Sequence, residues 1–287
     1  MGWGSVLLGH AHPGVTAAAM RQIPLGTNFA HVNARSLELA ERIVALSPAC
    51  DRVRMCSSGT EATMHCIRLA RAARRRPGIL KFEGAYHGSH DVGTTSLFGS
   101  KLHPWPQPEP LGSSMTPREA ADMLVAPFND AELACRLIAA HADELAAVIV
   151  EPLHRCLPPE PGFLQAVRRV LLMFDEVVTG FRLALGGAQE RYGVVPDLVA
   201  YGKAIGGGFP LGIYGGRADV LDLVREERMG RDDYVWTAST VGGNPVSCAA
   251  GLAVLDALSA PGVYARLDAL GEYLRAGMRR AIGHSGI

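Results

Sequence analysis

The sequence lacks an excess of charge of either sign, because its 28 basic and 28 acidic side chains cancel. Binding to nucleic acid or to an anionic membrane relies on surplus positive charge, so neither kind of partner is expected. The one basic cluster, RLARAARRR (68–76), has helical spacing and is interpreted as a solvated helix face.

Cysteine pairs and long apolar runs are also missing. The six cysteines are scattered and form no CxxC pair. Such spacing suits reduced, buried thiols better than disulfides or a zinc site, so no metal is expected. No apolar run approaches the roughly 18 residues of a membrane span, and the first residues lack the basic start of a signal peptide. We therefore expect a soluble, cytoplasmic protein.

What the sequence does contain is an alternation of short apolar runs with longer helical patterns. The runs GILKFEGAY, AAVIVEPL, VLLMFDEVV and DLVAYGKAI are rich in β-branched residues, whereas ELAERIVALSP and TEATMHCIRLARAARR repeat apolar residues at helical spacing. This order predicts an α/β fold with a mostly parallel central sheet and helices on both faces. Ligands of such sheets bind at the carboxyl ends of the strands, where Glu83, Glu151, Asp175 and Lys203 fall.

Two further segments have a clear local pattern. Residues 99–118 are dense in proline, glycine and serine, which predicts a surface loop or an ordered lid. The pattern GVYARLDALGEYLRAGMRRAI predicts a last helix over 262–282.

Two polar motifs follow predicted strands. SSGTEA (57–62) places Gly59 and Thr60 at a helix start, where free N–H groups and the helix dipole would stabilise a phosphate. An ordinary N-cap is the alternative. In YHGSHD (86–91), Tyr86 or His87 could stack on a flat ligand, and polar loop residues are the alternative. Neither this motif nor HAH (10–12) indicates a metal site.

A carboxylate and a lysine complete the candidate site. FDEVVTG (174–180) sets Asp175 at the end of a buried strand, where an ionised carboxylate is unfavourable unless a cation meets it. YGKAIGGGFPLG (201–212) sets Lys203 at a strand end, where a desolvated amine could attack a carbonyl. A surface lysine is the alternative. Together, an anion site, a stacking ring, a carboxylate and an amine are what pyridoxal phosphate needs.

These motifs resemble a known family. SSGTEA, YHGSHD, FDEVVTGFR, YGKAIGGGFPLG and STVGGNPVSCAAG together resemble a class III aminotransferase of the pyridoxal-phosphate-dependent transferase fold type I, over nearly the whole chain. DEVVTGFR, GVVPDLVAYGKAIGGGFPLGIYGG and EPLHRCLPPEPGFL are most similar to the glutamate-1-semialdehyde 2,1-aminomutase-like branch.

The resemblance implies a role for each matching residue. Lys203 would form a Schiff base with pyridoxal 5′-phosphate and then carry the proton between the substrate and the cofactor, and Asp175 would pair with the pyridinium nitrogen. The other implied cofactor contacts are Ser58, Gly59 and Thr60 at the phosphate, Tyr86 on the ring with His87 adjacent, Val178 on the other ring face, and Thr240 reaching the neighbouring subunit's phosphate. Glu151 would be an acid behind the residues that contact the cofactor. The role of Thr240 implies a homodimer with its sites at the interface.

The implied activity is ping-pong transfer of an amino group from a small-molecule donor to a keto or aldehyde acceptor. Arg182 is a candidate for binding a substrate carboxylate, and a helix-face residue is the alternative. Internal amine transfer of the aminomutase type uses the same residues. The aminomutase lid after YHG is Gly/Ser-rich, whereas TTSLFGSKLHPWPQPEP is Pro-rich, which favours transfer between two substrates.

Other functions stay open at this point. A decarboxylase or racemase is compatible with the same scaffold. A truncated paralogue that acts as a binding or structural protein would have an inert Lys203. A nicotinamide dehydrogenase is disfavoured because no early glycine fingerprint with an acidic partner is present.

The resemblance also predicts the domain organisation. Residues 1–258 are expected to form the large cofactor-binding domain, with 1–30 lining the site or the dimer interface, and 259–287 the incomplete start of a C-terminal small domain. Between AVRRV and LLMFDEVV the predicted helix runs into the strand at Val170 and Leu171, without the usual connection of roughly two to six residues. Family segments are therefore expected to be absent at both ends and at this junction.

Overall fold

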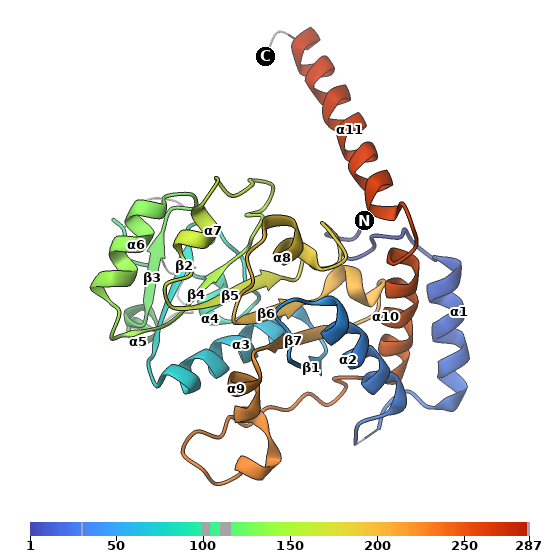
Figure 1. Ribbon diagram of the computed structural model, residues 1–287, viewed down its shortest axis with the longest axis horizontal. Helices are drawn as coiled ribbons and strands as arrows, with labels where there is room; N and C mark the ends of the chain where they lie inside the picture. Colours follow the sequence, from blue (N-terminus) through green and yellow to red (C-terminus); the bar gives the residue numbers. More distant parts are fainter. Residues whose placement is uncertain (30, 99–103, 110–115, 286–287) are drawn as a thin grey trace.

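A seven-stranded sheet in the order β1-β7-β6-β5-β4-β2-β3 forms the centre of the computed structural model (Figure 1). The structure describes residues 1–29, 31–98, 104–109 and 116–285. The strands are β1 (Arg52–Cys56), β2 (Gly78–Phe82), β3 (Met123–Ala126), β4 (Leu145–Val150), β5 (Leu171–Glu176), β6 (Leu198–Tyr201) and β7 (Gly212–Gly216).

Helices precede, connect and follow these strands. The α-helices are α1 (Pro13–Gln22), α2 (Ala34–Leu46), α3 (Gly59–Arg74), α4 (Asp91–Thr94), α5 (Pro117–Ala121), α6 (Ala131–Ala140), α7 (Phe163–Ala166), α8 (Gly187–Tyr192), α9 (Ala218–Leu221), α10 (Pro245–Leu258) and α11 (Val263–Ser285). The 3₁₀ turns are η1 (Ile23–Leu25), η3 (Lys203–Gly206), η4 (Asp222–Val224) and η5 (Glu226–Arg228).

Strand direction places the functional segments at one edge of the sheet. Strands β2 to β6 are parallel, β7 is antiparallel to β6, and β1 is antiparallel to β7. Strand β1 therefore runs in the same direction as β6. The carboxyl ends of β1, β2, β4, β5 and β6 meet at the same edge, which confirms the predicted mostly parallel sheet.

Side chains of the strands alternate between two hydrophobic cores, as a period of two requires. In β5, Leu172 and Phe174 pack into the core that also contains side chains of α2, α6, α7 and α10. Leu171 and Met173 pack into the opposite core, with α3 and α9. Helices therefore cover both faces, as predicted.

The connection before β5 differs from the prediction. Helix α7 ends at Ala166, and Val167 to Val170 form a turn before β5 begins at Leu171. The prediction of a helix that continues to Val170 was wrong. The turn has four residues, a common length for a connection between a helix and a strand.

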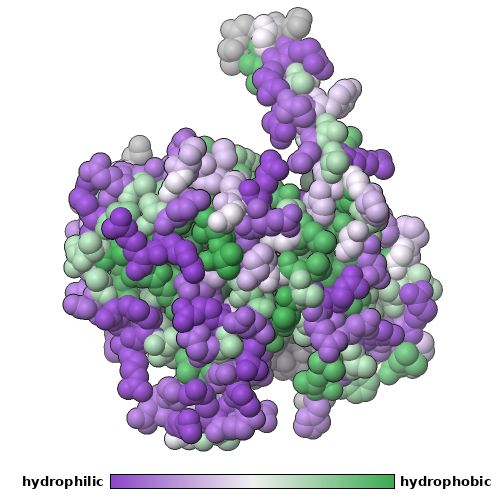
Figure 2. All heavy atoms as spheres, in the orientation of Figure 1, coloured by the Kyte–Doolittle hydropathy of each residue, from purple (hydrophilic) through white to green (hydrophobic). Residues whose placement is uncertain are grey.

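The last helix, α11, projects away from the rest of the chain (Figure 1). Its apolar side chains Leu270, Tyr273, Leu274 and Ile282 are exposed, and Figure 2 shows hydrophobic and hydrophilic residues side by side along it. The division into domains at 1–258 and 259–287 stays a prediction.

Within the described ranges no single helix is long and apolar enough to cross a membrane. Helix α10 and residues 263–283, bent by 79°, have that length and composition only as a pair.

Candidate functional site

A cavity of about 680 Å³ at the carboxyl edge of the sheet brings most of the predicted site residues together. The predicted residues that line it are Gly59, Thr60, Tyr86, His87, Glu151, Asp175, Val178 and Lys203. Ser58 lies immediately behind this lining as the N-cap of α3. Thr240 is exposed and lies outside the lining. Trp3 also lines the cavity, so part of the N-terminal segment reaches the site.

The first turn of α3 has features of both an N-cap and a phosphate site, the two interpretations of SSGTEA. The Ser58 side chain caps the helix by accepting a hydrogen bond from Glu61 N at 3.2 Å. Among the described residues, the N–H groups of Gly59 and Thr60 have no acceptor, as is usual for the first residues of a helix. A side chain at Gly59 would place its Cβ 2.7 Å from Val177 Cγ1. The helix start therefore offers two free donors and little bulk, which suits an anion.

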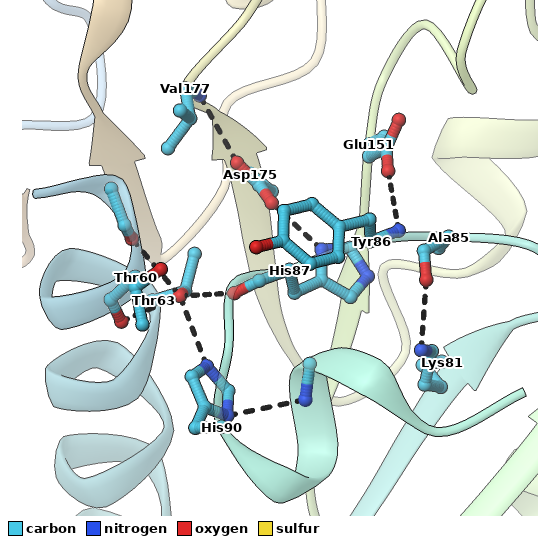
Figure 3. A network of polar contacts seen from close by, with 12 residues as sticks. Thr60, Thr63, Lys81, Ala85, Tyr86, His87, His90, Glu151, Asp175 and Val177 are labelled. Atoms are coloured by element: carbon cyan, nitrogen blue, oxygen red, sulfur yellow. Dashed lines mark hydrogen bonds and ion pairs between the residues drawn. The ribbon is translucent and has the colours of Figure 1, made fainter. Parts of the chain in front are cut away.

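The loop after β2 gives Tyr86 and His87 different positions (Figure 3). Tyr86 is 37% exposed, and its N–H donates to Glu151 Oε1 at 2.8 Å. His87 is buried, and its Nδ1 lies 2.8 Å from Asp175 Oδ2. Tyr86 is thus the ring available to a ligand in the cavity, while His87 contacts the carboxylate.

The adjacent carboxylates of β5 point to opposite faces of the sheet. Asp175 lies on the face of α3 and lines the cavity, and its Oδ1 accepts from Val177 N at 3.1 Å. Glu176 lies on the other face and accepts hydrogen bonds from Thr179 Oγ1, Ala188 N and Gln189 Nε2 at 3.0, 2.6 and 2.9 Å. Only Asp175 is therefore placed to meet a ligand.

Burial sets the charges of the Asp175 and His87 pair. Loss of solvent raises the pKa of Asp175 to about 6, against the hydrogen bond from Val177 and the positive charge of Lys203. Loss of solvent, followed by the charge of Lys81, lowers the pKa of His87 to about 3. At neutral pH the imidazole is neutral and its Nδ1–H donates to an anionic Asp175. Within the described part of the chain, the buried His87 Nε2 has no hydrogen-bond partner.

Lys203 follows β6 after one residue, Gly202, and begins the turn η3. It is half-buried, and its backbone has φ of +48°, a left-handed conformation that is uncommon for residues other than glycine. At Gly202 an added Cβ would lie 3.3 Å from Val177 Cγ1. The lysine therefore projects from a sharp turn at the cavity wall, next to the end of β5.

Sequence reasoning missed three polar residues around this loop. Lys81 in β2 is fully buried and donates through Nζ to the carbonyl oxygens of Ala85, at 3.0 Å, and Thr95. Thr63 Oγ1 donates to the His87 carbonyl oxygen. Arg155 lines the cavity, and its N–H donates to Glu151 Oε2 at 3.0 Å. The available signal was the lysine inside the otherwise apolar strand GILKF.

Arg182 does not line the cavity of the described chain. Its Nε donates to the Val178 carbonyl oxygen at 3.0 Å, and its Nη2 donates to the Gly4 carbonyl oxygen. Loss of solvent lowers the pKa of its guanidinium. The structure thus places Arg182 as a link between the N-terminal segment and the loop after β5.

Much of the predicted lid at 99–118 lies outside the described residues. In its described part, Trp105 Nε1 donates to Glu83 Oε2 at 3.2 Å, and the Pro106 carbonyl oxygen accepts from Val125 N at 3.0 Å.

No group of three or more His, Cys, Asp or Glu side chains in the described ranges could hold a metal ion.

The residues present fit pyridoxal phosphate. The free N–H groups at the start of α3 suit a phosphate, Tyr86 and Val178 line the cavity as faces for a flat ring, and Asp175 offers a buried acceptor. The cavity also contains the amine of Lys203, which suits an aldehyde.

Comparison with known proteins gives consistent matches. A family model described as "Aminotransferase class-III" matches residues 1–285. The chain is 45% identical over 294 residues to "Glutamate-1-semialdehyde 2,1-aminomutase" of Thermomicrobium roseum, covering 99% of this chain and 66% of that relative. An omega-transaminase structure from Sphaerobacter thermophilus has a TM-score of 0.93 and 38% identity, covering 100% of this chain and 67% of that chain. A structure described as "Transaminase with PLP bound" has a TM-score of 0.91 and 32% identity, covering 99% and 67%.

Proposed function

Because the chain belongs to the class-III aminotransferase family, we propose that it acts as a pyridoxal-phosphate-dependent aminotransferase. It would move an amino group from an amino donor to a keto or aldehyde acceptor. The observation that carries this proposal is the convergence of Lys203, Asp175 and the start of α3 on one cavity. The chain spans 66% of the length of its curated relative, so the activity is proposed for the protein that contains this chain.

Each residue would act through a stated group. When bound, the cofactor delocalises the electron pair that is left on the substrate carbon after bond cleavage. Asp175, anionic above about pH 6, would face the protonated ring nitrogen. His87 would orient Asp175 through its Nδ1–H. Lys203 Nζ, the amine that lines the cavity, would hold the aldehyde group of the cofactor and would carry a proton to and from the substrate carbon.

The remaining roles concern binding. The N–H groups of Gly59 and Thr60, with the dipole of α3, would bind the phosphate. Ser58, the N-cap of α3, would keep this helix start in place. Tyr86 and Val178 would pack on the two faces of the ring and exclude water from it.

We propose a homodimer, in the cytoplasm, in which Thr240 of a second copy contacts the phosphate. Thr240 is exposed and lies outside the cavity of its own chain, and Met20, Ile23, Leu25 and Phe29 are exposed apolar residues that a second copy would cover. The test mixes two inactive variants, Lys203→Ala and Thr240→Val. A mixed dimer contains one intact site of two, and random pairing of equal amounts makes about half of the dimers mixed, so mixing should restore activity to about a quarter of wild type. Absence of any recovery would contradict the shared site.

The experiment that tests the function is a titration of the chain with pyridoxal 5′-phosphate, followed by borohydride reduction and peptide mapping. We expect a visible absorption band and, after reduction, a cofactor adduct on Lys203. Lys203→Ala should lose both, and Glu176→Gln should keep both, because Glu176 faces away from the cavity. An adduct that is absent or distributed over other amines would contradict the proposal.

The name of the curated relative favours one second candidate, internal amine transfer of the aminomutase type. The two functions differ in what leaves the enzyme. An aminotransferase converts an amino donor to a free keto product and stays aminated until an acceptor arrives, whereas an aminomutase isomerises one substrate and releases no keto product. Stoichiometric release of keto product from an added donor would favour transfer between two substrates, and isomerisation of glutamate-1-semialdehyde without it would favour the aminomutase.

A further inference from the structure

Lys81 is a buried cation that the proposed reaction does not use. It lies in β2, between β4 and β3, and has no exposed surface. A charged amine in a strand that is buried on both faces is unfavourable unless it is hydrogen-bonded. None of the ion pairs between described residues includes Lys81. Its Nζ instead donates to two backbone carbonyl oxygens, those of Ala85 and Thr95 (Figure 3 shows the first).

These two carbonyl groups mark the ends of the segment that carries the ring residues of the site. The segment 85–95 leaves the sheet after β2, presents Tyr86 and His87 to the cavity, and returns through α4. Its ends are also joined by a hydrogen bond from Gly84 N to Ser96 O at 2.8 Å, and its middle by one from His87 N to Gly93 O at 3.1 Å. Lys81 therefore connects both ends of this segment to strand β2 by hydrogen bonds.

We propose that Lys81 is a positioning residue of this site, whose buried ammonium group holds segment 85–95 against β2 and so fixes Tyr86 and His87 in the cavity wall. Its role toward the cofactor rests on the proposed function; its role in holding the segment does not. Replacing the lysine with methionine would remove the hydrogen bonds that Nζ donates to the carbonyl oxygens of Ala85 and Thr95.

The electrostatics of the site agree with this geometry. Burial lowers the pKa of Lys81 to about 7, while the carboxylates of Glu151 and Glu83 raise it and the guanidinium of Arg155 lowers it. In turn the charge of Lys81 lowers the pKa of His87. The ammonium form, which predominates below about pH 7, therefore favours the neutral imidazole that donates to Asp175. The uncharged amine that replaces it above that pH keeps two N–H groups for the carbonyl oxygens of Ala85 and Thr95.

The test measures amide hydrogen exchange by mass spectrometry in wild type, Lys81→Met and Lys81→Gln, each without added cofactor. Lys81→Met should raise exchange in peptides that cover 85–96 by about tenfold, and Lys81→Gln, which keeps two N–H donors, by less. Ile79→Ala is the matched control. It removes a buried side chain from the same face of β2 and leaves the Nζ contacts of Lys81 in place, so it should lower the melting temperature and raise exchange in 85–96 by much less than Lys81→Met does.

A second measurement, the affinity for pyridoxal 5′-phosphate, tests whether the position of the segment affects ligand binding. The dissociation constant for pyridoxal 5′-phosphate should rise about tenfold in Lys81→Met and less than about twofold in Ile79→Ala at equal fractions folded. Unchanged exchange in 85–96 for Lys81→Met would overturn the proposal. If Lys81→Met does not fold, Lys81→Gln decides, and exchange equal to wild type together with wild-type affinity would overturn it. If wild type does not bind the cofactor, the proposed function fails while the exchange data still decide whether Lys81 holds the segment.

Discussion

Asp175→Asn is expected to stabilise the cofactor-free protein at neutral pH and to weaken its hold on the cofactor. The pKa of this buried carboxyl rises from 3.8 to about 6 because burial disfavours the charged form. The folded chain therefore holds this proton more tightly than the unfolded chain. It follows that the contribution of Asp175 to stability falls as pH rises from about 4 to about 6 and stays low above that range. A shift of about two pKa units corresponds to about 3 kcal/mol.

The hydrogen bonds around Asp175 reduce the stability that Asp175→Asn would gain at neutral pH. An asparagine oxygen can still accept from Val177 N, but the amide NH₂ would face His87 Nδ1, which now donates to Asp175 Oδ2. The imidazole would have to move its proton to Nε2, a buried atom without a partner among the described residues. This change should cost about 1 kcal/mol at all pH values. Asp175→Asn should then be about 1 kcal/mol less stable than wild type near pH 4 and about 2 kcal/mol more stable near pH 7.

The assay is guanidinium denaturation of both proteins between pH 4 and pH 8 after removal of pyridoxal phosphate, followed by cofactor titration at pH 7. Glu176→Gln is the matched control, because Glu176 is also buried but bonds to Thr179, Ala188 and Gln189 on the other face. It should leave cofactor affinity unchanged, whereas Asp175→Asn should weaken it at least tenfold, by about 1.4 kcal/mol or more. A stability difference that does not vary with pH, or wild-type affinity in Asp175→Asn, would refute the reasoning.

Two further substitutions, Gly88→Ala with Gly162→Ala as its control, and Arg182→Met, test the backbone around the site. At Gly88, where φ is +108°, an alanine Cβ would lie 2.7 Å from Thr60 Cα, so Gly88→Ala should lower the free energy of unfolding by about 2–3 kcal/mol and weaken phosphate binding. Gly162→Ala, also at positive φ but with no atom within 4 Å, should cost about 1 kcal/mol in the same denaturation assay and leave affinity unchanged. Arg182→Met should speed proteolysis of the segment around Gly4 without a selective rise in KM for acidic donors, and such a rise would restore Arg182 as a carboxylate ligand.

Much of the fold could be predicted because the strands are buried on both faces and read as short apolar runs. The position of Asp175 also followed from the sequence, since it comes at the end of such a run. The sequence could not say which of Asp175 and Glu176 faces the cavity. That depends on which face of β5 packs against α3, and both carboxylates follow apolar residues.

The pairings that define the site were beyond sequence reasoning because they join residues far apart in the chain. His87 and Asp175 are 88 positions apart and meet only because the loop after β2 folds back over β5. The motif YHGSHD left open whether Tyr86 or His87 faces a ligand. Burial separates them, since His87 is enclosed while Tyr86 is partly exposed. Arg182 was interpreted through its residue type alone, and its partners at Gly4 and Val178 explain its position without a substrate.

The two buried charges on the α3 face of the sheet, Asp175 and Lys81, have opposite effects on the same imidazole ring. Asp175 accepts its Nδ1–H, while the ammonium of Lys81 disfavours a second proton on it. A protonated His87 would neutralise Asp175 and leave no net charge to meet a ring nitrogen. A neutral His87 leaves Asp175 charged, with the positive charge of Lys203 acting on it. Burying a carboxylate is unfavourable to the folded chain alone. A cationic ligand at Asp175 would remove that penalty, so the removed penalty would contribute to the binding free energy.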